Sequence, residues 1–297
     1  LGPAAGERLL AELRDGVFAR IGVNRRLARA RPAETEIRAA LDDAARRHVR
    51  LVMHALAALG HHRTLNLVRT MMHSRDERSR ANAIESLASL PQRRLVIPIL
   101  PLIEDRETAG AAPAPGRFNP ALIDEMLSSP DPWLRAAAAV ARHRATGTGA
   151  ESLVRDPSPI VAETAAALAR RPAGNPPYPQ EALMSRLAFL HNVRLFAETS
   201  FDDLVAVDHA LVSRSYLPDE AIIREGEAGD RLCIIFSGSV AVTKGGQGLA
   251  CLAAGDFFGE MALFDDEPRS ASCNAIDDVE VLELDRDRFR SLVRERA

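Results

Sequence analysis

The sequence has no apolar run that approaches the roughly 20 residues needed to span a bilayer, and it shows no secretory signal pattern. Lysine is nearly absent, since Lys244 is the only one among 38 basic residues, which we interpret as genome composition. Cysteine is scarce too. Cys233, Cys251 and Cys273 fall in predicted strands without metal-type spacing, so we expect three buried free thiols. These absences predict a cytoplasmic chain without a transmembrane segment.

Catalytic and metal-binding patterns are also lacking. No nucleophile is paired with a base, and Gly245–Gly248 lacks the lysine and the following helix of a phosphate loop, so it predicts a hairpin turn. The acidic pairs Asp42-Asp43 and Asp124-Glu125 cannot face each other on a helix, so we interpret them as solvated. We therefore predict a protein that is not an enzyme and holds no metal or cofactor. Five histidines lack the pairing of a helical zinc site: His48, His54, His61, His62 and His73.

What the 297 residues do contain is a globular composition, 46% hydrophobic and 27% charged. This length allows two domains with separate cores. Residues 1–180 carry 26 basic and 19 acidic side chains, whereas residues 181–297 carry 12 and 22. The change of net charge supports a boundary near residue 180, and the acidic second half argues against a nucleic-acid partner.

The first half is predicted to be helical. Apolar residues recur at helical spacing in residues 7–30 and in residues 34–59, where Gly60 ends the pattern. Arginines crowd near the end of the first of these helices. They fit either a solvated helix end or a basic segment next to a membrane, which anionic lipid would attract. They are Arg20, Arg25, Arg26, Arg29 and Arg31.

A weak internal repeat follows. Asp76–Ala83 aligns with Asp131–Ala138, and Asp156–Ala165 is a degenerate third copy. Each copy places capping residues before an Ala-rich helix, and Trp133 is expected to pack between repeat helices. The pattern resembles HEAT-type helical repeats, which bury their faces by stacking on their neighbours.

A change of pattern begins after a proline-rich stretch. We expect a HEAT-like helical domain over residues 1–172, a semi-rigid linker over 173–180 and a second domain over 181–297. After a helix at 181–196, short strands alternate with glycine turns and Asp285 begins a last helix, as in an antiparallel jelly roll with flanking helices. The fold class is therefore α+β multidomain. The expected strands are 212–217, 222–224, 232–236, 240–244, 250–253, 272–276 and 279–284.

The residues after Phe258 concentrate groups that suit an anion. Gly259 lets the backbone approach a ligand closely. A helical turn from Glu260 through Met261 and Ala262 would offer free N–H groups and a positive dipole end. We therefore place backbone donors for an anionic ligand in this turn.

Arg269 adds a guanidinium fork that matches phosphate oxygens in two places. Ser270, Ala271 and Ser272 offer further hydroxyl and N–H donors. A carboxylate at Glu260 would repel a bare phosphate, but it can accept from the hydroxyls of a sugar. The ligand that this indicates is a small sugar phosphate of low charge.

The stretch FGEMAL followed by PRSAS resembles the phosphate-binding cassette of the cyclic nucleotide-binding domain family. The resemblance extends over residues 183–297, where the segments 222–230, 232–240 and 255–260 are similar to the family's glycine-punctuated strands. It implies a cyclic nucleotide ligand, with cyclic AMP as the first choice.

The resemblance also implies roles for single residues. Glu260 would bind the ribose 2′-hydroxyl, Arg269 the cyclic phosphate, and Ser272 lies where a hydroxyl helps to bind guanine, which keeps cyclic GMP open. The chain stops before the helix that commonly closes over the base in this family. Backbone N–H groups near Gly259, Ala262 and Ala271 would complete the phosphate cradle.

The implied function is a cyclic nucleotide-sensing regulatory module coupled to a helical repeat domain. The alternative is a protein-interaction scaffold whose jelly roll has lost its ligand. A transcription regulator is disfavoured, because no helix-turn-helix follows. The domain order also resembles the C-terminal region of some bacterial nucleotide-transporter-like membrane proteins. With no methionine at Leu1, this predicts a piece of a longer chain on the cytosolic side of a membrane, with the rest of that chain or another protein as partner.

Overall fold

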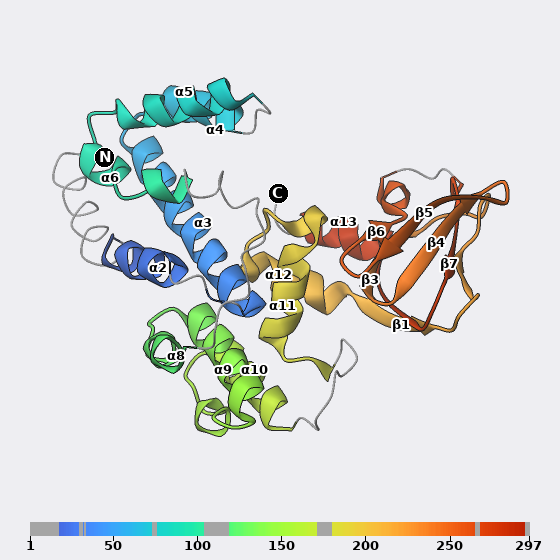
Figure 1. The fold of residues 1–297 in the computed structure, drawn as a ribbon. Coiled ribbons are helices and arrows are strands. Elements are labelled where there is room, and N and C mark those ends of the chain that lie inside the picture. Colours follow the sequence, from blue (N-terminus) through green and yellow to red (C-terminus); the bar gives the residue numbers. More distant parts are fainter. Residues whose placement is uncertain are drawn as a thin grey trace. The chain divides into compact units, whose positions relative to one another are not determined.

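The computed structural model describes residues 18–29, 32, 34–72, 76–103, 119–170, 180–264 and 268–294. The chain divides into two compact units, Leu1–Glu125 and Met126–Ala297 (Figure 1). This division lies ahead of the expected linker, of which residues 173–179 are outside the described part. The assignment of residues 1–172, 173–180 and 181–297 to two domains and a linker stays a prediction.

The first unit is helical, as expected. Its longest helix, α3, confirms the prediction for residues 34–59. The helix ends at Ala58, and it is followed by Leu59 and by Gly60, which has φ +99°. Fully buried apolar side chains of α3, α4 and α5 form its core, among them Val52, Val68 and Leu87. Its helices are α2 (Ala19–Arg29), α3 (Thr35–Ala58), α4 (His62–Met72), α5 (Glu77–Ala88) and α6 (Arg93–Val96), and α8 (Pro120–Leu127) crosses the division.

The interpretation of Asp42-Asp43 as a solvated pair is wrong for Asp43, whose side chain is fully buried. It lies on the face of α3 that carries the buried residues Ala39, Ala40 and Ala44. An Arg47 Nε one turn later lies 3.1 Å from its carboxylate, so burial is offset by an ion pair along the helix.

Two of the predicted helix caps are confirmed. Asp76 accepts from the backbone N–H of Ser79 at 3.0 Å, and Asp131 accepts from that of Trp133 at the same distance. The third copy differs, because Asp156 pairs with Arg135 through two contacts of 2.8 and 3.0 Å. The helices of the second unit are α9 (Pro132–Thr146), η2 (Glu151–Leu153), α10 (Pro159–Ala169), α11 (Leu183–Asn192), η4 (Arg194–Phe196), α12 (Phe201–Ala210), η5 (Glu260–Leu263) and α13 (Arg286–Arg294).

Trp133, which we expected to pack between repeat helices, is buried and contacts a helix of the region beyond them. Its ring meets that of Phe201, the first residue of α12, edge-on at 5.2 Å. On α11, Arg186 holds Asp208 of α12 at 2.9 Å and lies 3.7 Å from Glu163 of α10. The helices before and after the expected linker are therefore joined by aromatic and ionic contacts within one unit.

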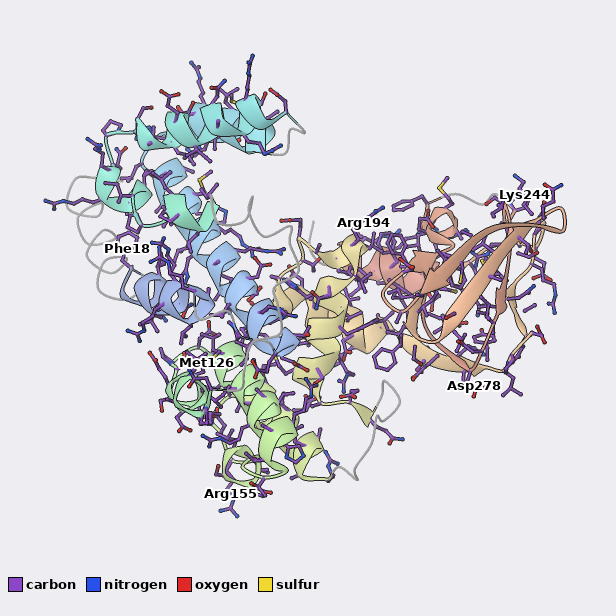
Figure 2. All side chains as sticks on the ribbon, viewed as in Figure 1. Phe18, Met126, Arg155, Arg194, Lys244 and Asp278 are labelled. Atoms are coloured by element: carbon purple, nitrogen blue, oxygen red, sulfur yellow. The ribbon has the colours of Figure 1, made fainter. Side chains whose placement is uncertain are left out.

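The strands form two antiparallel sheets (Figure 1). Each sheet has four strands, in the orders β1-β8-β3-β6 and β2-β7-β4-β5. Seven of them match predicted strands and β6 was not expected. The predicted hairpin at Gly245–Gly248 joins β4 to β5, next to Lys244 (Figure 2). The strands are β1 (Val212–Tyr216), β2 (Ala221–Ile223), β3 (Arg231–Ser237), β4 (Ser239–Lys244), β5 (Gln247–Ala253), β6 (Phe257–Phe258), β7 (Ser272–Ala275) and β8 (Val279–Asp285).

A small apolar core lies between the sheets and includes Ile235, Phe258 and Val281. Cys233 and Cys273 belong to it, but the expectation that all three cysteines are buried is wrong for Cys251. Cys251 is exposed because β5 is the edge of its sheet and its residues face solvent almost throughout.

The start of α13 is as predicted, since Asp285 accepts from the backbone N–H of Arg288 at 2.9 Å. Within the described ranges, no helix has both the length and the apolar character that crossing a membrane requires. In the same ranges, no three histidine, cysteine or acidic side chains gather as metal ligands would.

Candidate functional site

The candidate site begins where β6 ends. Gly259 has φ +77°, a left-handed conformation that glycine adopts without strain, and the single turn η5 follows it. A Cβ on Gly259 would lie 2.4 Å from Nη1 of Arg269. Both the backbone conformation and the space beside Arg269 therefore require glycine here, while the predicted close approach of a ligand stays a prediction.

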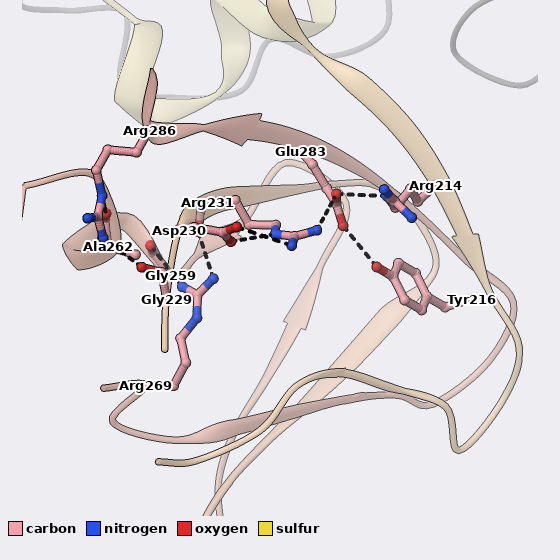
Figure 3. Close-up of polar contacts among 10 residues, drawn as sticks. All are labelled: Arg214, Tyr216, Gly229, Asp230, Arg231, Gly259, Ala262, Arg269, Glu283 and Arg286. Atoms are coloured by element: carbon pink, nitrogen blue, oxygen red, sulfur yellow. Dashed lines mark hydrogen bonds and ion pairs between the residues drawn. The ribbon is translucent and has the colours of Figure 1, made fainter. Parts of the chain in front are cut away.

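Arg269 is buried at the centre of this site, with 8% of its surface exposed. Its Nη1 donates to the carbonyl of Gly259 at 3.2 Å and its Nη2 to that of Arg231 at 3.0 Å (Figure 3). A Cβ on Gly229 would approach its Nε to 2.9 Å. The guanidinium is thus held between two glycines by neutral acceptors. Neither acceptor cancels its charge, and burial strengthens its attraction for an anion.

The other residues of the turn differ in accessibility. Glu260 is half-buried, Met261 is exposed and Ala262 is buried. The N–H of Ala262, an expected phosphate donor, donates within the turn to the carbonyl of Gly259 at 3.2 Å. The structure therefore places Gly259, Glu260 and Arg269 together, whereas the Ala262 donor is engaged locally.

The last predicted site residues lie before and at the start of β7. Ser270 is exposed and Ala271 half-buried. The Oγ of Ser272 accepts from the backbone N–H of Glu225 at 2.9 Å, which ties β7 to the loop after β2. The Ser272 hydroxyl acts as an acceptor in this contact, so its own hydrogen remains available for donation.

A charged cluster beside the site was missed by sequence reasoning. Arg231 Nε lies 2.8 Å from Asp230, and its Nη1 lies 2.9 Å from Glu283 of β8. The carboxylate of Glu283 also accepts from Arg214 Nε and from the Tyr216 hydroxyl, each at 2.9 Å (Figure 3). The local signal was Glu283, one of two glutamates in the otherwise apolar strand 279–284.

This cluster shifts proton affinities. The hydrogen bond from Arg231 lowers the pKa of Asp230. Burial, followed by the hydrogen bond to Glu283, raises the pKa of Tyr216. Burial raises the pKa of Cys233 to about 12, and the nearby Glu283 carboxylate adds to the shift. The tyrosine and the thiol are therefore neutral at pH 7, whereas Asp230 is charged.

Arg286, the first residue of α13, ties three segments together. Its side chain donates to the carbonyls of Ala262 and Gly229, each at 2.6 Å (Figure 3), and its backbone N–H donates to the backbone carbonyl of Asp230 at 2.8 Å. The turn η5, the loop before β3 and helix α13 are therefore linked by one side chain.

Comparisons with known proteins identify a similar domain in the strand region. Residues 213–296 match the family model of the cyclic nucleotide-binding domain. A cAMP-dependent protein kinase regulatory subunit of Debaryomyces hansenii is 38% identical over 106 residues, which are 35% of this chain and 24% of that protein. A cGMP-dependent protein kinase of Toxoplasma gondii is 40% identical over 87 residues, which are 29% of this chain and 9% of that protein.

Among solved structures, the regulatory domain of Toxoplasma gondii PKA with cAMP is 30% identical, with a TM-score of 0.35, over 37% of this chain and 45% of that one. The aligned part spans about a quarter or less of the length of the kinase relatives. Those relatives are eukaryotic, so the bacterial transporter-like context finds no support among them, and the HEAT assignment stays a prediction. The match does identify the strand region: residues 213–296 form a cyclic nucleotide-binding domain.

Proposed function

We propose that the chain is a regulatory module that binds a cyclic nucleotide, with cyclic AMP as the first choice, and passes its occupancy to the helices before it. The observation that carries this proposal is Arg269, which is buried between Gly229 and Gly259 and bound to neutral carbonyls. A buried guanidinium whose hydrogen bonds go to neutral carbonyls suits the single negative charge of a cyclic phosphate.

The remaining contacts follow from the same placement. Arg269 clamps the phosphate, and Glu260, one residue after Gly259, accepts from the ribose 2′-hydroxyl. Backbone N–H groups of the turn and of Ala271 complete the anion site, once the Ala262 donor leaves its local partner. Ser272 would meet the base, and the relatives include both cAMP- and cGMP-dependent proteins, so both ligands belong in the test.

Several features of this proposal concern the whole protein. The module acts in the cytoplasm and does not catalyse a reaction. Its effector is either a further part of the same chain or a protein bound by the HEAT-like helices. The aromatic and ionic contacts of α9 and α10 with α11 and α12 support such a link.

Calorimetric titration of the 297-residue chain tests the proposal. We expect saturable binding of one cyclic AMP or cyclic GMP per chain, and no comparable binding of adenosine, which lacks the phosphate that Arg269 would hold. If neither cyclic nucleotide binds, the sensing proposal fails and the scaffold alternative takes its place.

A further inference from the structure

The geometry points to a positioning role for the charged cluster next to the site. We propose that the Glu283 cluster, defined as Arg214, Tyr216, Arg231 and Glu283, fixes Arg269 in the orientation that receives the phosphate and thereby sets the affinity for the nucleotide. This inference rests on the proposed function of the same site. It concerns side chains that lie behind Arg269 and contact the ligand only through it.

The first step is the carbonyl of Arg231. It accepts from Nη2 of Arg269 at 3.0 Å, while the Gly259 carbonyl accepts from Nη1 at 3.2 Å. The two carbonyls approach the same planar guanidinium, so together they set both its position and its tilt. A misplacement of about 1 Å at such a binding group can cost two orders of magnitude in function.

The second step is what holds the Arg231 carbonyl. Arg231 is the first residue of β3, where it pairs with Asp285 at the end of β8. Its side chain lies between two carboxylates, with Nε 2.8 Å from Asp230 and Nη1 2.9 Å from Glu283. Glu283 is opposite Cys233, two residues further along β3. The side chain therefore fastens the end of the strand to a neighbouring strand (Figure 3).

The third step is the anchor itself. Glu283 retains only 6% of its surface exposed, and its carboxylate accepts from Arg231, Arg214 and Tyr216. These four residues come from β1, β8 and β3, which are consecutive in one sheet. The cluster thus connects three strands to the back of Arg269.

The sequence of β8 indicates that Glu283 has a role beyond packing in the core. Val279 and Val281 alternate along the strand, lie in the core between the sheets, and share a face with Glu283. An apolar residue at position 283 would continue that core. A buried ion pair is often no more stabilising than an apolar replacement, so its geometric effect is the better explanation for a glutamate here.

The test is a set of cyclic AMP affinities measured by calorimetry on the full 297-residue chain. We expect Glu283→Gln and Arg231→Met each to weaken binding roughly tenfold, the size expected for residues coupled in one ion-pair network. Arg26→Met is the matched control, because Arg26 forms an exposed ion pair with Glu125 in the first unit, outside the domain that holds the cluster. We expect it to change affinity by less than about twofold.

A double-mutant cycle separates positioning from general stability. In an Arg269→Ala background, Glu283→Gln should have less than about a twofold effect, since there is no guanidinium left to position. Equal losses in both backgrounds, or wild-type affinity in Glu283→Gln and Arg231→Met, would overturn the inference. If these variants fail to fold, Tyr216→Phe removes one hydroxyl, and a loss of about threefold that vanishes in the Arg269→Ala background is then expected.

Cyclic nucleotide binding by the wild-type chain distinguishes a failure of this inference from a failure of the proposed function. Absence of cyclic nucleotide binding by the wild-type chain removes both. Binding by the wild type, with affinity insensitive to Glu283, Arg231 and Tyr216, removes only the positioning role. Melting temperatures of each variant, measured without ligand, confirm that affinities are compared between folded proteins.

Discussion

At the scale of single residues, the site depends on one buried charge. Among the described residues, two glycines make room for the Arg269 side chain, and two carbonyls without formal charge accept from its guanidinium. Glu260 lies on the adjacent turn with its side chain half-buried. Arg269 and Glu260 therefore offer a donor for a phosphate and an acceptor for a hydroxyl within one short segment.

Replacing Arg269 by alanine should weaken cyclic AMP binding by about thirty-fold to several thousand-fold. A charged partner left unpaired in a desolvated site costs roughly 2–5 kcal/mol, and each tenfold in affinity corresponds to about 1.4 kcal/mol. Arg269→Lys, which keeps the charge without the fork, should lie between alanine and the wild type. Unchanged affinity of Arg269→Ala in a calorimetric titration would remove this residue from the site.

Cyclic 2′-deoxy-AMP should bind at least about tenfold more weakly than cyclic AMP, because a hydrogen bond to a charged group contributes roughly 1.5–3 kcal/mol. The same two titrations on Glu260→Gln serve as the control, since the difference between the ligands should shrink there. Equal affinity of the wild type for both nucleotides would mean that Glu260 accepts from some other group.

At the scale of elements, what could be predicted was what is encoded locally. The caps at Asp76 and Asp131, the hairpin at Gly245–Gly248 and most strand positions follow from residues close in sequence. The Glu283 cluster could not be predicted, because Tyr216 is 67 residues and Arg231 52 residues from Glu283. Residues that are brought together by the pairing of distant strands leave no pattern in the local sequence.

The Arg135–Asp156 pair gives the α9–α10 segment a pH dependence. The hydrogen bond from Arg135 lowers the pKa of Asp156 in the folded protein. The stabilisation is therefore complete above the unfolded pKa of about 3.9 and is lost as the pH falls from there through the folded value. Urea midpoints between about pH 7 and pH 2 should fall less steeply in Asp156→Asn than in the wild type.

Asp278→Asn, at an exposed position between β7 and β8, is the control for loss of one acidic charge in this experiment. The urea midpoints of Asp278→Asn should decrease toward acid pH as those of the wild type do. Parallel curves for Asp156→Asn and the wild type would show that the Arg135 contact does not act in solution.

At the scale of the second unit, α11 contacts α9 and α10, and α12 contacts α13. Arg186 connects α11 to α12 and to α10, and the Trp133 and Phe201 rings connect α9 to α12. A ligand can shift such contacts only by favouring one of two arrangements. A ligand-dependent preference for one arrangement would reach α9 and α10 through Arg186, Trp133 and Phe201.

Saturating cyclic AMP should therefore change hydrogen exchange in residues 181–200 and, to a smaller degree, in α9 and α10. In Arg186→Met, the response of α10 should diminish while that of residues 255–275 remains. Protection limited to residues 255–275 in the wild type would describe a domain that binds its ligand without signalling to the helices.

The most direct test of the central claim is a crystal structure of the chain with cyclic AMP bound. The account predicts the cyclic phosphate against the Arg269 guanidinium at about 2.7–2.9 Å, as in other charge-assisted hydrogen bonds, and the ribose 2′-hydroxyl at Glu260. A nucleotide bound away from Gly259 and Arg269, or one whose phosphate faces solvent while Arg269 still donates only to the Gly259 and Arg231 carbonyls, would contradict it.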